Sequence, residues 1–240
     1  MAKAQRHIAP AKQPHLSDRL NVIIAAAGIG RRMKSHGPKS LLVVHRGVTL
    51  IEKQIRTILA VYPNADIVVA CGFEGHKIRN ELYGQFPVRF VYNTEYETSN
   101  VVYSVSLALD ACLPGNILLI HGDIAFNKEA IQLTKCSSLL VALPQQIEAH
   151  KVGMIVQDQR VTMLSHGLPT QWGQIAYLAN DELKIFRDAI TKNKASKQWF
   201  LYEALNYVLH KGGTLRAHQD AHAHILEINR PQDIVGVRQI

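Results

Sequence analysis

A glycine-containing segment near the start of the chain gathers residue types that suit the binding of an anion. Three glycines, Gly28, Gly30 and Gly37, lie within ten positions, and the same segment carries four basic side chains, Arg31, Arg32, Lys34 and Lys39. A flexible glycine turn lets backbone N–H groups approach a polyphosphate while cationic side chains neutralise its charge. A surface loop rich in solvated charge is the alternative for such a segment taken alone.

The loop differs from the two commonest phosphate-binding motifs. A Walker A loop needs four residues between its glycines and a glycine directly before its lysine. Here six residues separate Gly30 from Gly37, and Pro38 precedes Lys39. A Rossmann fingerprint needs Gly or Ala where this chain has Met33. The segment therefore predicts an anion-binding turn of another kind.

The distribution of charge favours a small anionic ligand over a nucleic acid. The 240-residue chain has 27 Lys and Arg against 19 Asp and Glu, a net charge of +8. Residues 21–60 hold seven basic side chains against Glu52 alone, whereas residues 61–240 hold 16 against 17 acids. A nucleic-acid-binding protein more often spreads basic residues over a face with aromatic residues between them. We therefore expect no nucleic-acid partner.

Strand-like and amphipathic segments alternate along the chain. Buried strands are expected over residues 20–27, 66–71, 88–92 and 116–121, with helices over 49–61, 74–83 and 101–112 between them. After about residue 137 the pattern changes to strands over 138–143, 152–156, 161–164, 214–218 and 222–228, with helices over 181–191 and 199–209. This predicts an α/β fold with one mixed sheet, a Rossmann-like first half, and ligands at the carboxyl ends of the strands.

Composition and patterning also indicate the extent of the domain and its compartment. Residues 1–19 lack apolar periodicity and are expected to form a mobile basic tail, with one domain over residues 20–240. The domain divides into a first half at 20–125 and a second half at 126–240. The apolar runs are strand-sized, so no membrane partner is expected. Three cysteines at spacings unlike a redox pair or a zinc site fit the reducing cytoplasm.

Several motifs together resemble a known family. Residues 26–33 and 38–41 resemble the AGxGxRM…PKxL signature of nucleotidyltransferases with a GT-A-like fold, which include MobA-like and sugar-phosphate nucleotidyltransferases. Further similar motifs are Val69–Phe73 and Ile120-His121-Gly122-Asp123. Residues 91–107 are most similar to the bacterial choline-phosphate cytidylyltransferases. The resemblance covers residues 20–125 and 225–234.

The resemblance implies transfer of a nucleotidyl group from a nucleoside triphosphate to an acceptor phosphate, with release of pyrophosphate. It implies that Arg31 meets the β- and γ-phosphates and that Lys39 stabilises charge at the α-phosphate, so these two are the expected catalytic residues. The implied nucleotide-binding residues are Ala26, Ala27, Gly28, Gly30, Arg31, Lys39, Gly72, Asn93 and Ser104.

The resemblance also implies Mg²⁺, held at two strand ends. Asp123 follows a buried strand and is the first expected ligand. Asn229 stands where many members of the family have Asp, and is the expected second ligand. Glu227 points to the same strand face by period-two alternation and is the alternative.

The acceptor is expected to contact residues of two segments. Tyr96 and Asn100 lie in the first, although Asn100 also suits the N-cap of the helix that follows. In the second half, an aromatic cage of Trp172, Trp199 and Tyr202 with the Glu203 carboxylate would suit a quaternary ammonium. Core packing is the alternative, since Trp199 and Tyr202 recur at helical spacing.

Three functional hypotheses follow. The first is a cytidylyltransferase that joins CMP from CTP to a small phosphorylated alcohol such as phosphocholine. The second is a sugar-1-phosphate nucleotidyltransferase, and the third is a catalytically inactive nucleotide-binding regulator. A GT-A glycosyltransferase would normally carry Asp-x-Asp at the metal strand, and Asp123-Ile124-Ala125 lacks the second Asp. The sequence carries no indication of oligomeric state.

Overall fold

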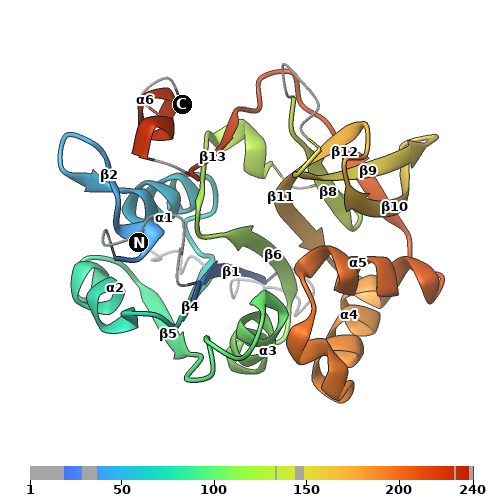
Figure 1. The fold of residues 1–240 in the computed structure, drawn as a ribbon, viewed down its shortest axis with the longest axis horizontal. Coiled ribbons are helices and arrows are strands. Elements are labelled where there is room, and N and C mark those ends of the chain that lie inside the picture. Colours follow the sequence, from blue (N-terminus) through green and yellow to red (C-terminus); the bar gives the residue numbers. More distant parts are fainter. Residues whose placement is uncertain (1–18, 29–36, 133, 144–148, 230, 238–239) are drawn as a thin grey trace, which may run out of the picture.

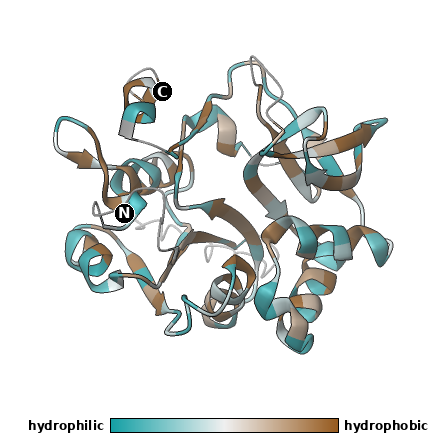
Figure 2. Ribbon diagram, in the orientation of Figure 1, coloured by the Kyte–Doolittle hydropathy of each residue, from teal (hydrophilic) through white to brown (hydrophobic). Residues whose placement is uncertain are grey.

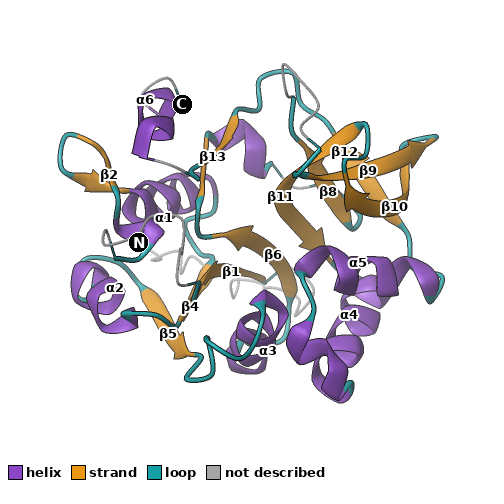
Figure 3. Ribbon diagram, in the orientation of Figure 1, coloured by secondary structure: helices purple, strands orange, loops and turns teal. Residues whose placement is uncertain are grey.

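The computed structural model describes residues 19–28, 37–132, 134–143, 149–229, 231–237 and 240. The predicted α/β class and mixed sheet are confirmed: nine strands of the described residues form one sheet, in the order β5-β4-β1-β6-β11-β8-β12-β10-β9. Helices surround this sheet (Figure 1 and Figure 3). The predicted mobile tail, residues 1–19, lies outside the described residues except for Arg19.

The first half of the sheet is parallel. Its strands are β1 (Leu20–Ala26), β4 (Asp66–Cys71), β5 (Val88–Tyr92) and β6 (Asn116–His121), connected in part by the helices α1 (Leu50–Val61), α2 (Gly75–Leu82) and α3 (Val101–Ala111). Strand β1 pairs in parallel with β4 on one side and β6 on the other. Because parallel strands run in one direction, the carboxyl ends of β1, β4, β5 and β6 meet at one edge of the sheet.

Alternation along β1 assigns its side chains to two cores. Val22 and Ile24 belong to the apolar cluster that includes α1 and α2, whereas Ile23 belongs to the cluster that includes α3 and the later helices. All three side chains are fully buried. Period-two alternation in a strand gives this two-sided burial, which is expected where helices cover both faces of a sheet. The strands are accordingly the apolar centre of the molecule (Figure 2).

Helix α1 begins at a capping box that the sequence encodes locally. The Thr49 side chain accepts a hydrogen bond from the Glu52 N–H, and the Glu52 carboxylate accepts one from the Thr49 N–H at 2.9 Å. This reciprocal pair satisfies two backbone donors that a helix start leaves open. The predicted helix over 49–61 therefore begins one residue later, with Thr49 as its cap.

The second half continues the sheet and closes on itself. Its strands are β8 (Ser138–Val141), β9 (Val152–Gln157), β10 (Arg160–His166), β11 (Thr170–Leu178) and β12 (Leu215–His218). Strand β11 runs antiparallel beside β6, and β9 pairs with both β10 and β11. The pairings β11-β8-β12-β10-β9-β11 therefore form a ring. Helices α4 (Asn180–Lys192) and α5 (Leu201–His210) contribute to the same core as α3.

Strand β11 was not expected from the sequence, although it joins the two halves. Its pairing register with β8 shifts between Trp172 and Ala176, and Gln174 has a positive φ of 57°. The irregularity interrupts the alternation that would identify a strand. Gly173 adds a second interruption in the sequence pattern.

Short elements complete the fold around the sheet edge. They are β2 (Val43–His45), β3 (Val48–Thr49), β7 (Ile124–Phe126), β13 (Ile225–Glu227), α6 (Ile234–Val237) and the 3-10 turns η3 (Lys39–Leu41), η4 (Lys128–Ile131), η5 (Lys194–Gln198) and η6 (Pro231–Asp233). The β13–β7 pair brings the end of the chain to β6, where the Ile228 N–H donates to the Asp123 carbonyl at 2.8 Å. The strand predicted over 222–228 is shorter than expected. Among the helices described, none has the length and apolarity to cross a bilayer.

Gly122 permits the close approach of β1 and β6 at their carboxyl ends. Its N–H donates to the Ala25 carbonyl at 2.9 Å. A Cβ at this position would lie 2.8 Å from that carbonyl oxygen and 2.9 Å from the Ala26 Cβ. Both neighbours belong to a central strand, so neither can move without disturbing the sheet.

We predict that Gly122→Ala lowers the free energy of unfolding by about 1–3 kcal/mol, the usual cost of overpacking a tight site. Urea denaturation measures the change. Gly28→Ala is the matched control, because a Cβ on Gly28 would meet no atom of the described residues within 4 Å. Equal stability of the two variants would contradict the assigned constraint.

Candidate functional site

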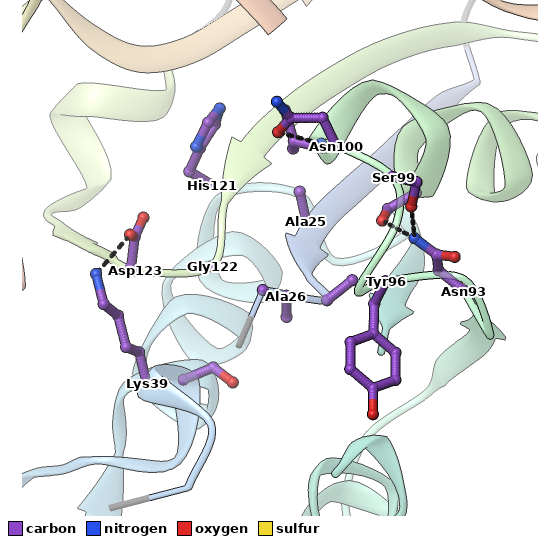
Figure 4. Close-up of a pocket in the computed structure, with 15 residues that line it drawn as sticks. Ala25, Ala26, Lys39, Asn93, Tyr96, Ser99, Asn100, His121, Gly122 and Asp123 are labelled. Atoms are coloured by element: carbon purple, nitrogen blue, oxygen red, sulfur yellow. Dashed lines mark hydrogen bonds and ion pairs between the residues drawn. The ribbon is translucent and has the colours of Figure 1, made fainter. Parts of the chain in front are cut away.

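A cavity of about 230 Å³ lies at the carboxyl ends of the parallel strands. Six predicted nucleotide-binding residues line it, namely Ala26, Ala27, Gly28, Lys39, Asn93 and Ser104. Asp123, Tyr96 and Asn100, predicted for the metal and the acceptor, line the same cavity. In Figure 4 the labelled side chains come from the end of β1, from η3, from the end of β6 with the two residues after it, and from the segment between β5 and α3. We call this space the first cavity.

Lys39 joins two of the predicted metal ligands. Its ammonium Nζ donates to Asp123 Oδ2 at 3.1 Å and to Asn229 Oδ1 at 3.4 Å (Figure 4 shows the first contact). The Lys39 side chain is 14% exposed and that of Asp123 27%. Asp123 and Asn229, which lie 84 and 190 positions from Lys39 in the sequence, thus present oxygen atoms to one cation. Pro38 precedes the turn η3 that carries Lys39 to this place.

The oxygen atoms around Lys39 are of the kind that Mg²⁺ takes as ligands. The carboxylate of Asp123 and the amide oxygen of Asn229 converge on a single positive charge, so a cation fits between them. A backbone hydrogen bond keeps the two segments together, since the N–H of Ile228, next to Asn229, donates to the Asp123 carbonyl at 2.8 Å. No group of three or more His, Cys, Asp or Glu side chains gathers elsewhere in the described residues.

Asn93 and Ser104 hold one another at the wall of the first cavity. Asn93 Nδ2 donates to the hydroxyls of Ser99 and Ser104, each at 2.9 Å, and Asn93 Oδ1 accepts the Glu95 N–H at 2.8 Å. Both residues are buried, at 3% exposure each. They therefore shape the segment before α3 as well as lining the cavity.

Asn100 caps α3, which is the alternative role expected for it from the sequence. Its side-chain oxygen accepts the Val101 N–H at 2.8 Å, and its amide donates to the Gln198 carbonyl at 3.3 Å. Tyr96 lines the first cavity and meets the Phe73 ring edge-on, with 6.1 Å between ring centroids.

The remaining predicted nucleotide contacts are Gly72, Gly30 and Arg31. Gly72 does not line the first cavity; it lets two segments pass closely, because a Cβ there would lie 2.5 Å from the Ala27 carbonyl oxygen and 2.9 Å from the Tyr96 Cβ. Gly72 thus allows the close contact between the segment after β1 and the segment after β5. Gly30 and Arg31 lie outside the described residues.

A second cavity of about 220 Å³ adjoins the first. Two residues, Val101 and His121, line both. The second cavity is otherwise formed by the ring of strands, α5 and the end of β13, and it contains three further groups of note, Lys151, Phe200 and Glu227. Its walls combine aromatic rings, imidazoles, amides and one carboxylate.

The expected aromatic cage is only partly assembled at the second cavity. Trp172 and Tyr202 line it, but Trp172 is 97% buried, and its Nε1 donates to the Ile175 carbonyl at 3.0 Å. Trp199 lines neither cavity and lies against Tyr207 instead, 5.8 Å between ring centroids. Its helical spacing indicated core packing, and that alternative describes its position.

Glu203 also lies outside both cavities. Its carboxylate accepts the Phe200 N–H at 2.7 Å and so caps the first turn of α5. The cage of Trp172, Trp199 and Tyr202 is thus corrected to a pair of stacked rings, Phe200 and Tyr202, whose centroids lie 5.9 Å apart at 12°. The helix start places Phe200 at the cavity and turns Trp199 away from it.

Sequence reasoning missed two residues that the fold brings to this site. Phe200 is exposed and precedes α5, where Trp199, Tyr202 and Glu203 had been singled out instead. His121 lies directly before Gly122-Asp123 in a motif already noted, and this adjacency was the available signal. Burial lowers the pKa of the His121 imidazole, and the nearby carboxylates of Asp123 and Glu227 offset part of that effect.

Comparisons with known proteins agree with this geometry. Over 91% of its length the chain is 27% identical to the bifunctional protein GlmU of Synechococcus, and it covers 35% of that protein. It is 34% identical over 121 residues to the choline-phosphate cytidylyltransferase of Haemophilus influenzae, which is 49% of each chain. The chain thus spans half or less of these two relatives.

The fold has a close counterpart among solved structures. The structure described as the CTP:phosphocholine cytidylyltransferase LicC from Streptococcus pneumoniae superposes with a TM-score of 0.77 at 21% identity, over 92% of this chain and 98% of that one. Residues 22–163 match the model of the MobA-like NTP transferase domain. These residues include the parallel strands β4, β5 and β6, the glycine turn and the Lys39–Asp123 pair described above. The resemblance expected from the motifs is confirmed, and the chain belongs to the MobA-like NTP transferase family.

Proposed function

We propose that the protein is a nucleotidyltransferase that takes a nucleoside triphosphate, CTP first, into the first cavity and a small phosphorylated alcohol into the second. The observation that carries this proposal is the contact between the two cavities beside the Lys39–Asp123 pair. The relative from Haemophilus influenzae, named as a choline-phosphate cytidylyltransferase, supports CTP and phosphocholine as the first pair to test.

The chemistry is a displacement at phosphorus. An oxygen of the acceptor phosphate attacks the α-phosphorus of the triphosphate and forms a new P–O bond. The bond from the α-phosphorus to the oxygen bridging it to the β-phosphorus breaks, and that oxygen keeps the electron pair as pyrophosphate leaves. Since both reactants are anions, positioning and charge neutralisation supply most of the catalysis.

The residues of this chain fit these two tasks. The turn after β1 exposes Gly28 at the cavity, where backbone can approach phosphates closely. Lys39 brings a fixed positive charge to the same wall, at the place where charge develops around the α-phosphate. The hydrogen bond from Asn93 to Ser104 holds the segment after β5 against helix α3.

Mg²⁺ is part of the proposal, with Asp123 and Asn229 as the residues that would hold it. When bound, the ion would neutralise phosphate charge and orient the triphosphate. Lys39 contacts the same two oxygen atoms. With the ion bound, Lys39 would be free to contact the nucleotide phosphates.

A sugar 1-phosphate is the second candidate acceptor, and one atom favours it. Gln171 lines the second cavity, and its Oε1 is buried with no hydrogen-bond donor among the described residues. A hydroxyl group would supply that donor, whereas the quaternary ammonium of choline has no N–H. A site built to bond a hydroxyl rejects an analogue that lacks it.

We predict pyrophosphate release when four nucleoside triphosphates are tested with Mg²⁺ against phosphocholine, phosphoethanolamine and sugar 1-phosphates, with CTP and phosphocholine the fastest pair. Asp123→Asn should abolish turnover and leave the thermal midpoint unchanged, because Asp123 is partly exposed and its side chain bonds Lys39 at the cavity wall.

Ser106→Ala is the control variant, since Ser106 lies on the same helix as Ser104, its hydroxyl donates to the Tyr103 carbonyl at 2.8 Å, and it lines neither cavity. Release of pyrophosphate with no pair would favour the inactive regulator. Faster release with a sugar 1-phosphate would assign the protein to the second candidate class.

We predict that Lys39→Met tightens the binding of Mn²⁺ alone by about tenfold, which corresponds to loss of one competing charge-assisted contact of about 1.4 kcal/mol. The same variant should lose turnover, because the charge needed at the α-phosphate is gone. Electron paramagnetic resonance of free Mn²⁺ measures the affinity without any reaction.

Lys128→Met serves as the comparison, since Lys128 is 70% exposed and pairs only with Glu129 among the ion pairs described. Its Mn²⁺ affinity should equal that of the wild type. An unchanged Mn²⁺ affinity in Lys39→Met would show that Asp123 and Asn229 do not hold the ion.

A further inference from the structure

We propose that His121 holds the phosphate of the acceptor at the point where the two cavities meet, through its ring nitrogen Nε2. The inference rests on the proposed function and adds a binding residue to it. Of the described residues only Val101 and His121 line both cavities, and Val101 is apolar. His121 is therefore the polar side chain shared by the two spaces.

The position of His121 follows from the reaction geometry. A nucleotide in the first cavity and an acceptor in the second react only where the α-phosphorus and the acceptor phosphate touch. That contact lies on the boundary between the cavities, which His121 occupies. Figure 4 shows the imidazole above Gly122 and Asp123, on the side toward Asn100.

Packing fixes the orientation of the ring. His121 ends β6, where it pairs with Ala25 of β1. Its ring meets the Trp172 ring edge-on, with 5.8 Å between centroids and 86° between planes. Trp172 is held in turn by its hydrogen bond to the Ile175 carbonyl. The imidazole thus rests on a core residue of β11 and needs little reordering to bind a ligand.

One nitrogen of this fixed ring has no partner. Nε2 of His121 is buried and makes no hydrogen bond within the described residues. A buried polar atom without a partner costs free energy, which a ligand regains when it supplies the missing bond. In the tautomer with its proton on Nε2, the ring donates to a phosphate oxygen.

The charges around the second cavity agree with a phosphate at this boundary. Lys151, His150 and His166 line that cavity, whereas Glu227 is its acid. Asp123 lies on the first-cavity side, where Lys39 pairs with it. An acceptor phosphate bound at His121 would therefore meet one carboxylate among the residues that line the second cavity, that of Glu227.

Isothermal titration with two probes, phosphocholine and glucose 1-phosphate, tests the inference. The enzyme is first saturated with Mg²⁺ and a CTP analogue that has a methylene group between the α- and β-phosphorus, so that no reaction follows. His121→Phe keeps a ring against Trp172 but removes the donor. It should weaken binding of whichever probe the wild type binds by about 10- to 100-fold, as expected for one hydrogen bond to an anion. Affinity for the CTP analogue should stay within twofold.

Two further variants separate ligand binding from packing. His121→Asn restores an N–H donor and should recover part of the lost affinity. His218→Phe is the matched control, because Nε2 of His218 is also buried without a partner in the described residues, but His218 lines neither cavity. It should leave both affinities unchanged.

The outcomes are distinct. Unchanged probe binding in His121→Phe overturns the inference, as does an equal loss of probe and analogue binding, which would mean a packing role. Failure of the wild type to bind either probe also overturns it. Absence of pyrophosphate release from the wild type with every pair would instead refute the proposed function.

Discussion

The parallel pairing of β1 with β4 and β6 is the constraint on which the site depends. Because these strands run together, the turn after β1, the segment after β5 and the Gly122-Asp123 turn after β6 end at one edge. None of these segments would form a cavity alone. The glycine at 122 lets β1 and β6 approach to hydrogen-bonding distance at that edge.

The two cavities at this edge differ in the charged residues that line them. The basic excess of residues 21–60 reaches the first cavity through Lys39, which pairs with the Asp123 carboxylate and donates to the Asn229 amide oxygen. A triphosphate with its metal ion brings both signs of charge into this arrangement. The second cavity is more mixed in character, as expected of a space that selects among small acceptors.

Local patterns predicted much of the fold. Asp66–Cys71, Val88–Tyr92 and Asn116–His121 are strands with the bounds expected, because each is a short apolar run between turn residues. Strand β11 escaped prediction because its bulge breaks the alternation. Local sequence signals give no direct measure of a register shift that tertiary pairing imposes.

The residues of the site also fall into those that the sequence predicts and those that it does not. Lys39, Asn93 and Asp123 could be named because their motifs are continuous in sequence and follow strand ends. The aromatic residues could not be placed, since helical spacing alone does not tell which side of α5 faces a cavity. His121 was overlooked for a related reason: its importance comes from two spaces that meet only after β11 has docked beside β6.

The ring of strands limits the sheet edges at which another copy of this chain could add a strand. Since β9 returns to pair with β11, the sheet keeps one open margin in the described residues, at β5. Open margins invite strand addition and aggregation. On β5, which is only five residues long, the exposed Arg89 pairs with Asp66 of the neighbouring strand and donates to the Ala111 carbonyl. Closure at one end, and a short edge strand that carries a charged residue at the other, thus limit strand addition to this sheet among the described residues.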